Sequence, residues 1–222
     1  MSKKNSAVRF EGFIFDVDGT LTSTNELIFQ SFNHVAEKYL NKIYTPEELI
    51  ALFGPPEDLI LKELVGEKYP EAHKDYFDFY FSNHTALAGL YPGIKDILLM
   101  IKNAGIPLGV FTGKGRKAAE ITLKTLGIYH YFDLVSTGDD VPNFKPAPDG
   151  ILMFLDEFKL NNENVLLIGD APADIKAARA AGVKIASVVW DSYAKQIVLE
   201  SNADYIFHTV EELKSFIQNH IS

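Results

Sequence analysis

Short apolar runs alternate with amphipathic stretches along most of this chain, from Ile106 to the C-terminal region. The runs are rich in Val, Ile, Leu and Phe, which is typical of buried strands, and we expect strands at 107–111, 134–136, 164–168, 184–189 and 204–207. The stretches between them have apolar residues at helical spacing, and several end at glycine. They predict helices at 94–104, 116–126, 148–158, 173–181, 192–201 and 211–219.

This alternation predicts an α/β fold, a Rossmann-like parallel sheet with helices on both faces. An earlier apolar run, 12–15, adds a strand near the N-terminus. Residues 22–89 differ, because they show helical periodicity, many aromatic residues and no convincing strand. We therefore expect a Rossmann-like core formed by 1–21 and 90–222, with 22–89 inserted as an all-helical cap domain whose aromatic residues mostly serve packing. The two hinges are expected at 20–24 and 88–93.

Composition narrows the class of protein. The 222 residues are 47% hydrophobic and include no cysteine, so one core and a smaller module can form without disulfides. The net charge of −9 disfavours nucleic acid and anionic lipid as partners. The start of the chain, 1–6, is polar, and no run of about 18 apolar residues occurs. We therefore expect no export signal, no membrane span and a cytoplasmic protein. We expect it to be either a monomer or a homodimer.

Two acids, Asp16 and Asp18, follow the first predicted strand and lead into Gly19. Residues i and i+2 of an extended chain point to the same side, roughly 6.5 Å apart, so both carboxylates could face one substrate. The simpler interpretation is that Asp-Gly marks a turn after a strand.

Three further polar clusters follow predicted strands or lie in loops beside them. They are Thr112-Gly113-Lys114, Lys145-Pro146-Ala147-Pro148 and Gly169-Asp170-Ala171-Pro172-Ala173-Asp174. The carboxyl ends of parallel strands meet at one edge of a sheet, where such clusters would come together. Each also has an ordinary interpretation: a Ser/Thr turn, a solvated loop lysine, and acids that cap the following helix.

Together the four clusters, in this order and strand context, resemble the four motifs of the haloacid dehalogenase-like superfamily. The helical insertion lies where that superfamily carries a helical cap. The segments 112–116, 137–140 and 145–149 resemble its phosphoglycolate phosphatase and pyrophosphatase branch. The resemblance spans nearly the whole chain and implies a phosphatase.

Roles for the acids follow from phosphate chemistry and from this resemblance. Asp16 could attack phosphorus as a carboxylate and form an aspartyl phosphate, and Asp18 could give a proton to the leaving group and later take one from water. An anionic nucleophile approaching a phosphate needs positive charge, which indicates Mg²⁺. Asp16 and Asp170 are its expected ligands, the resemblance adds the Asp18 main-chain carbonyl, and Asp174 is expected to support this shell.

The remaining motif residues are expected to bind the phosphate. Thr112 offers a hydroxyl, Gly113 an accessible N–H at the start of a helix, and Lys145 a charge that also holds Asp16 ionised. The resemblance extends this expectation to Val17 and Lys114.

The leading hypothesis is a Mg²⁺-dependent phosphohydrolase acting on a small phosphorylated metabolite, either a phosphoglycolate-like phosphomonoester or pyrophosphate. Asp18 argues against dehalogenation, because a halide leaves without a proton. The alternatives are a sugar-phosphate mutase, which usually needs a cap arginine that 22–89 lacks, and a non-catalytic phosphate-binding module. The apolar loop 52–57 resembles the family's specificity loop and favours a small or partly apolar leaving group.

Two rival signals are weaker. The segment 113–118 fits a dinucleotide-binding fingerprint with Asp133 downstream, but that acid precedes its strand, whereas a ribose-binding acid should end one. The six histidines show no pair at helical metal-ligand spacing, which disfavours zinc.

Overall fold

A parallel six-stranded sheet forms the centre of the molecule, as the sequence predicts. The computed structural model describes residues 9–221; residues 1–8, on which part of the expected absence of an export signal rests, and residue 222 lie outside it. The strands are β1 (Gly12–Phe15), β4 (Leu108–Phe111), β5 (Leu134–Ser136), β6 (Val165–Gly169), β7 (Lys184–Val188) and β8 (Tyr205–Phe207). Their order is β5-β4-β1-β6-β7-β8, and every neighbouring pair is parallel.

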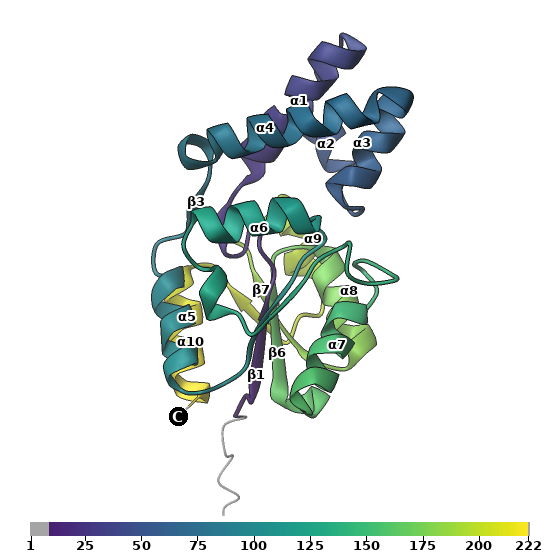
Figure 1. Ribbon diagram of the computed structural model, residues 1–222. Coiled ribbons are helices and arrows are strands. Elements are labelled where there is room, and N and C mark those ends of the chain that lie inside the picture. Colours follow the sequence, from purple (N-terminus) through teal and green to yellow (C-terminus); the bar gives the residue numbers. More distant parts are fainter. Residues whose placement is uncertain (1–8, 222) are drawn as a thin grey trace, which may run out of the picture.

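Helices cover both faces of this sheet (Figure 1). One face carries α5 (Ile94–Asn103) and α10 (Val210–His220), and the other carries α7 (Asp149–Phe158) and α8 (Pro172–Ala181). The remaining helices beside the sheet are α6 (Arg116–Thr125) and α9 (Lys195–Glu200), and short 3₁₀ turns occupy Gly66–Lys68, Tyr129–Tyr131 and Asn162–Asn164.

Helix α9 is shorter than predicted at its start. The prediction began this helix at 192, whereas the structure begins it at Lys195. The Ser192 hydroxyl donates to the Asp170 carbonyl at 2.5 Å and accepts from the Ala194 N–H, which holds this segment in a loop against the sheet edge.

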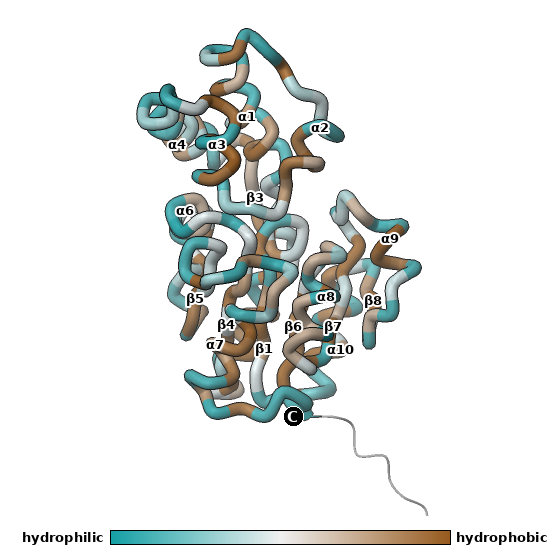
Figure 2. The backbone as a smooth tube through the Cα atoms, turned by 90° about the vertical axis from the view of Figure 1, so that its right-hand side faces the viewer, coloured by the Kyte–Doolittle hydropathy of each residue, from teal (hydrophilic) through white to brown (hydrophobic). Residues whose placement is uncertain are grey.

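Successive side chains of each strand point to opposite faces of the sheet, so the core consists of two apolar clusters, one on each face. Phe13 and Phe15 of β1 enter the cluster on the α5 face, and Ile14 enters the one on the α7 face. The tube coloured by hydropathy shows this apolar interior along the strands (Figure 2). Each such side chain is almost fully buried and contributes about 1.5–3 kcal/mol of hydrophobic stabilisation. The sheet is therefore a rigid base for the loops at its edge.

Four helices lie beyond the carboxyl edge of the sheet (Figure 1): α1 (Asn25–Leu40), α2 (Pro46–Ile50), α3 (Glu57–Val65) and α4 (Tyr69–Leu87). They enclose a third apolar cluster, in which the Phe32 and Tyr76 rings lie 4.9 Å apart. The prediction that these aromatic residues mostly serve packing is confirmed for this pair, whereas Phe81 is 64% exposed.

The prediction of no strand within 22–89 was wrong at both ends of that segment. Strands β2 (Thr22–Ser23) and β3 (Gly89–Leu90) pair antiparallel where the chain leaves the sheet and where it returns. Two residues are too few to show an alternating pattern, so only the pairing of distant segments reveals them.

Within residues 9–221, every helix is too short or too polar to span a lipid bilayer.

Candidate active site

The predicted site residues gather around one cavity of about 130 Å³, which lies between the carboxyl edge of the sheet and helices α1 and α3 with the loop that precedes α3. Those that line it are Asp16, Asp18, Thr112, Gly113, Lys114, Lys145, Asp170 and Asp174. Val17 is different, because its side chain is buried in the core. A phosphate contact from Val17 stays a prediction, and with the side chain in the core it would have to come from the main chain.

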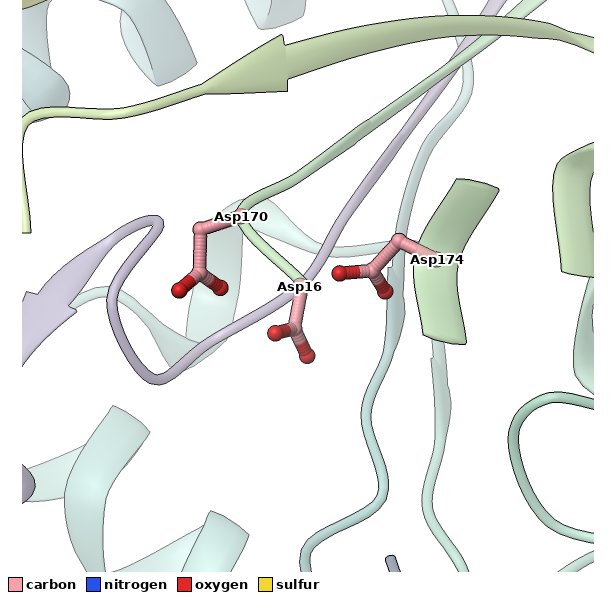
Figure 3. A group of neighbouring side chains, drawn as sticks. All are labelled: Asp16, Asp170 and Asp174. Atoms are coloured by element: carbon pink, nitrogen blue, oxygen red, sulfur yellow. The ribbon is translucent and has the colours of Figure 1, made fainter. Parts of the chain in front are cut away.

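Three of the carboxylates that line this cavity lie close together (Figure 3). Oxygens of Asp16, Asp170 and Asp174 lie within 4.8 Å of one another, and all three residues are buried. Burial raises the pKa of Asp16 to about 6, although Lys145 opposes the shift. Burial, together with Asp16 and Asp174, also raises the pKa of Asp170 well above its usual value. An oxygen-only donor set with excess negative charge fits a hard divalent cation.

Asp174 makes the helix-capping contact that is one of its two sequence interpretations, and its support of a metal shell stays a prediction. Its Oδ2 accepts the Ala171 N–H at 3.0 Å, which is the helix-capping contact at the start of α8. Its Oδ1 accepts from the Lys145 ammonium at 2.5 Å. The capping contact therefore fixes the Asp174 carboxylate in a position from which it also binds the Lys145 ammonium.

Lys145 is buried, which contradicts the interpretation of a solvated loop lysine. Its Nζ lies 2.9 Å from Asp16 Oδ1 and 4.8 Å from the centre of the Phe111 ring. Burial works to lower the pKa of this lysine, but Asp16 and Asp174 outweigh it and raise that pKa. Lys145 is thus a fixed positive charge beside the expected nucleophile.

Asp18 lies apart from the three clustered carboxylates and is only partly buried. Its Oδ1 accepts from the Thr24 hydroxyl, and its Oδ2 lies 3.1 Å from Lys114 Nζ. Thr24, directly before α1, was not singled out from the sequence, where it looks like an ordinary helix-capping residue. The two acids after β1 therefore have different surroundings, which suits different roles.

Lys114 faces Asp18 and the inserted helices. Its buried ammonium lies 3.4 Å from Glu57 Oε1 and 5.3 Å from the centre of the Tyr80 ring. Burial works to lower the pKa of Lys114, but Asp18, Tyr80 and Glu57 raise it well above its usual value. Sequence reasoning gave Glu57 no role of its own, and the only signal was one acid at the end of an otherwise apolar loop.

Gly19 permits the tight turn after Asp18. Its φ of +75° is unfavourable for other residues, and a Cβ there would collide with the Asp170 carboxylate. This close approach brings the turn after Asp18 against the segment that carries Asp170.

A Gly19→Ala variant is expected to lose about 2–4 kcal/mol of unfolding free energy, because backbone strain and the collision add. Gly105→Ala is the matched control: φ there is +70° and the space around it is open, so it should lose only about 1 kcal/mol. Urea unfolding of both variants measures the difference. Equal losses would show that the approach to Asp170 is not tight.

Comparisons with known proteins agree with this geometry. A family model described as haloacid dehalogenase-like hydrolase matches residues 13–188. Pyrophosphatase PpaX of Anoxybacillus flavithermus is 32% identical over 204 residues, which is 92% of this chain and 95% of that protein.

Solved structures share the fold. The crystal structure of a predicted phosphoglycolate phosphatase from Haemophilus somnus has a TM-score of 0.85 and 24% identity, covering 95% of this chain and 99% of that one. The structure of CbbY from Rhodobacter sphaeroides in complex with phosphate has a TM-score of 0.80 and 24% identity, covering 92% and 96%. The resemblance carried by the four motifs is confirmed, and the chain belongs to the haloacid dehalogenase-like hydrolase family.

Proposed function

We propose that this protein is a Mg²⁺-dependent phosphohydrolase that acts on a small phosphorylated metabolite through an aspartyl-phosphate intermediate. One observation carries the proposal: Asp16 lies 2.9 Å from a buried lysine at the sheet edge, while Asp18, two residues on, faces a separate part of the same cavity. The name of the relative from Anoxybacillus flavithermus, a pyrophosphatase, supports phosphate chemistry.

The first half-reaction transfers the phosphoryl group to Asp16. A carboxylate oxygen of Asp16 forms a bond to phosphorus while the bond from phosphorus to the leaving oxygen breaks. Asp18 gives its proton to that oxygen. Lys145, the Thr112 hydroxyl and the Gly113 N–H stabilise the transferring phosphoryl oxygens.

The second half-reaction releases phosphate. Asp18, now a carboxylate, takes a proton from water as the water oxygen bonds to phosphorus, and the bond to Asp16 breaks. Inorganic phosphate leaves, and both acids return to their starting states.

Mg²⁺ would be held by Asp16 and Asp170, with the Asp18 main-chain carbonyl added by family resemblance and Asp174 as support. When bound, it supplies positive charge that neutralises the phosphoryl oxygens. The buried carboxylate cluster supports this assignment, because among the described residues the ion pairs of these three acids come from one cation, Lys145, which pairs with Asp16 and Asp174.

Residues 22–89 would act as a cap over the core formed by 1–21 and 90–222. Two contacts between these parts support a closed position: Phe53 packs edge-on to Tyr193 with ring centres 5.9 Å apart, and the Gly115 N–H donates to Glu57 at 2.6 Å. Closure over the cavity would exclude bulk water from the intermediate. Lysines are the only cations lining the cavity among the described residues, which favours hydrolysis over a mutase that grips a second phosphate with arginine.

The test is a phosphatase assay of the purified protein with Mg²⁺ and a panel of phosphorylated metabolites, using an aryl phosphate as a general substrate. We expect turnover that depends on Mg²⁺ and is lost in Asp16→Asn, which keeps the side-chain shape but removes the charge of the nucleophile. Turnover no greater than that of the Asp16→Asn control would refute the enzyme and favour a non-catalytic binding module.

A further inference from the structure

The cavity divides into two ends by charge. Lys145 lies at the Asp16 end, where the phosphoryl group would sit. Lys114 lies at the other end beside Asp18, where the leaving group would sit. Helices α1 and α3 and the loop between α2 and α3 also line the cavity. Their contributions are Asn25, Ile28, Phe32, Phe53, Glu57 and Ile60. Glu57 lies at the Lys114 end, 3.4 Å from the Lys114 ammonium. The inserted helices therefore bring apolar surface, one amide and one acid to the cavity.

Glu57 is held in a fixed position at this end. It is buried at the first turn of α3 and accepts the Gly115 N–H on Oε2 at 2.6 Å. Its Oε1 lies 3.4 Å from Lys114 Nζ. Burial raises the pKa of Glu57, and the two groups that hold it, both from the loop after β4, oppose that shift by stabilising its charged form. With these contacts formed, Glu57 lines the cavity.

The charge of Lys114 is already shared by two acids. Asp18 lies 3.1 Å away on one side and Glu57 3.4 Å on the other. A leaving group with its own negative charge would meet the Glu57 carboxylate and the Asp18 carboxyl group, and it would have to displace one of them from the lysine. It would also lose its hydration against apolar walls, which is costly for a charge and cheap for a hydrocarbon.

An uncharged leaving group meets no such penalty. The Lys114 ammonium is in ion-pair contact with both acids but makes no aligned hydrogen bond to a described residue, so it retains a donor for a neutral oxygen such as a hydroxyl. The carbon atoms of that group would lie against Ile28, Phe32 and Ile60.

We propose that Glu57 determines the substrate class of this site and makes it selective for phosphomonoesters whose leaving group is uncharged. This inference rests on the proposed phosphohydrolase function. Glu57 acts by neutralising Lys114, the cation beside Asp18 that an anionic leaving group could use.

A matched pair of substrates tests the proposal on the unmodified protein. 2-Hydroxyethyl phosphate and phosphoglycolate have nearly the same size, and they differ in carrying a neutral hydroxymethyl group or a carboxylate. With Mg²⁺, we expect kcat/KM to be at least about tenfold higher for 2-hydroxyethyl phosphate, mainly through KM. Equal values, or a preference for phosphoglycolate or pyrophosphate, would overturn the proposal without needing any variant.

Glu57→Gln assigns the effect to this residue. The glutamine oxygen can still accept the Gly115 N–H, but the negative charge is gone, so the preference for the neutral ester should fall by about tenfold. Asp58→Asn is the control, since Asp58 is the next residue of α3 and contacts Tyr69 and His73 outside the cavity; its ratio should match that of the unmodified protein.

A folded Glu57→Gln protein with an unchanged ratio would overturn the assignment, and if this variant fails to fold, the ratio of the unmodified protein decides. Failure of the underlying phosphohydrolase proposal is recognised separately, because then neither ester would be hydrolysed faster than by Asp16→Asn.

Discussion

An Asp18→Asn variant is expected to lose about 10²–10⁴-fold in kcat on alkyl phosphates, because it can neither protonate the leaving oxygen nor activate water. The substitution is nearly isosteric. Its amide oxygen can still face Lys114, which lies 3.1 Å from the present carboxylate, and the Thr24 hydroxyl can still donate to it. The loss should therefore come from the missing proton transfer.

The two half-reactions separate this role from a structural one. An aryl phosphate whose phenolate leaves without a proton should still phosphorylate Asp16 in the variant, giving a burst of phenolate followed by very slow turnover. Mg²⁺ binding, measured by calorimetry, should persist in Asp18→Asn and be lost in Asp170→Asn. Full activity of Asp18→Asn on an alkyl phosphate would contradict the proton-shuttle role.

Much of this architecture is visible in the sequence, because the signals are local. Strands 12–15 and 134–136 are found where predicted. The predicted strands 107–111, 184–189 and 204–207 differ from the structure by one residue at one end, and 164–168 lies one residue later, at Val165–Gly169. Buried parallel strands give continuous apolar runs, and glycines such as Gly105 and Gly127 end the helices between them. The topology then brings the residues that follow β1, β4 and β6 to one edge, so four motifs spread over the chain predict one site.

The leaving-group end of the cavity could not be predicted in the same way. The contact between Lys114 and Glu57 joins the loop after β4 to the start of α3, and neither local periodicity nor motif spacing fixes how the inserted helices lie on the core. Lys114 was accordingly expected to bind phosphate, whereas its ammonium lies between two carboxylates. The β2–β3 pairing at the hinges is missed for the same reason.

Lys145 compensates part of the negative charge of the buried carboxylates at this site. Three acids lie within 4.8 Å of one another in a buried position, and the lysine pairs with Asp16 at 2.9 Å and with Asp174 at 2.5 Å. Removing one partner of a buried ion pair is costly because the other charge stays buried without compensation. A divalent cation bound by the same acids would supply part of the missing charge.

A Lys145→Met variant, similar in length but uncharged, is therefore expected to lose about 3 kcal/mol of unfolding free energy without Mg²⁺. Saturating Mg²⁺ should reduce this deficit, whereas kcat should stay about 10²–10³-fold low, because the lysine also stabilises the transferring phosphoryl group. Lys159→Met is the control. Lys159 pairs with Asp156 at the same 2.9 Å, but both side chains are highly exposed, so the change should stay within about 1 kcal/mol. Urea unfolding with and without Mg²⁺ measures these differences, and a deficit that Mg²⁺ leaves unchanged would mean that the lysine and the metal ion do not act on the same carboxylates.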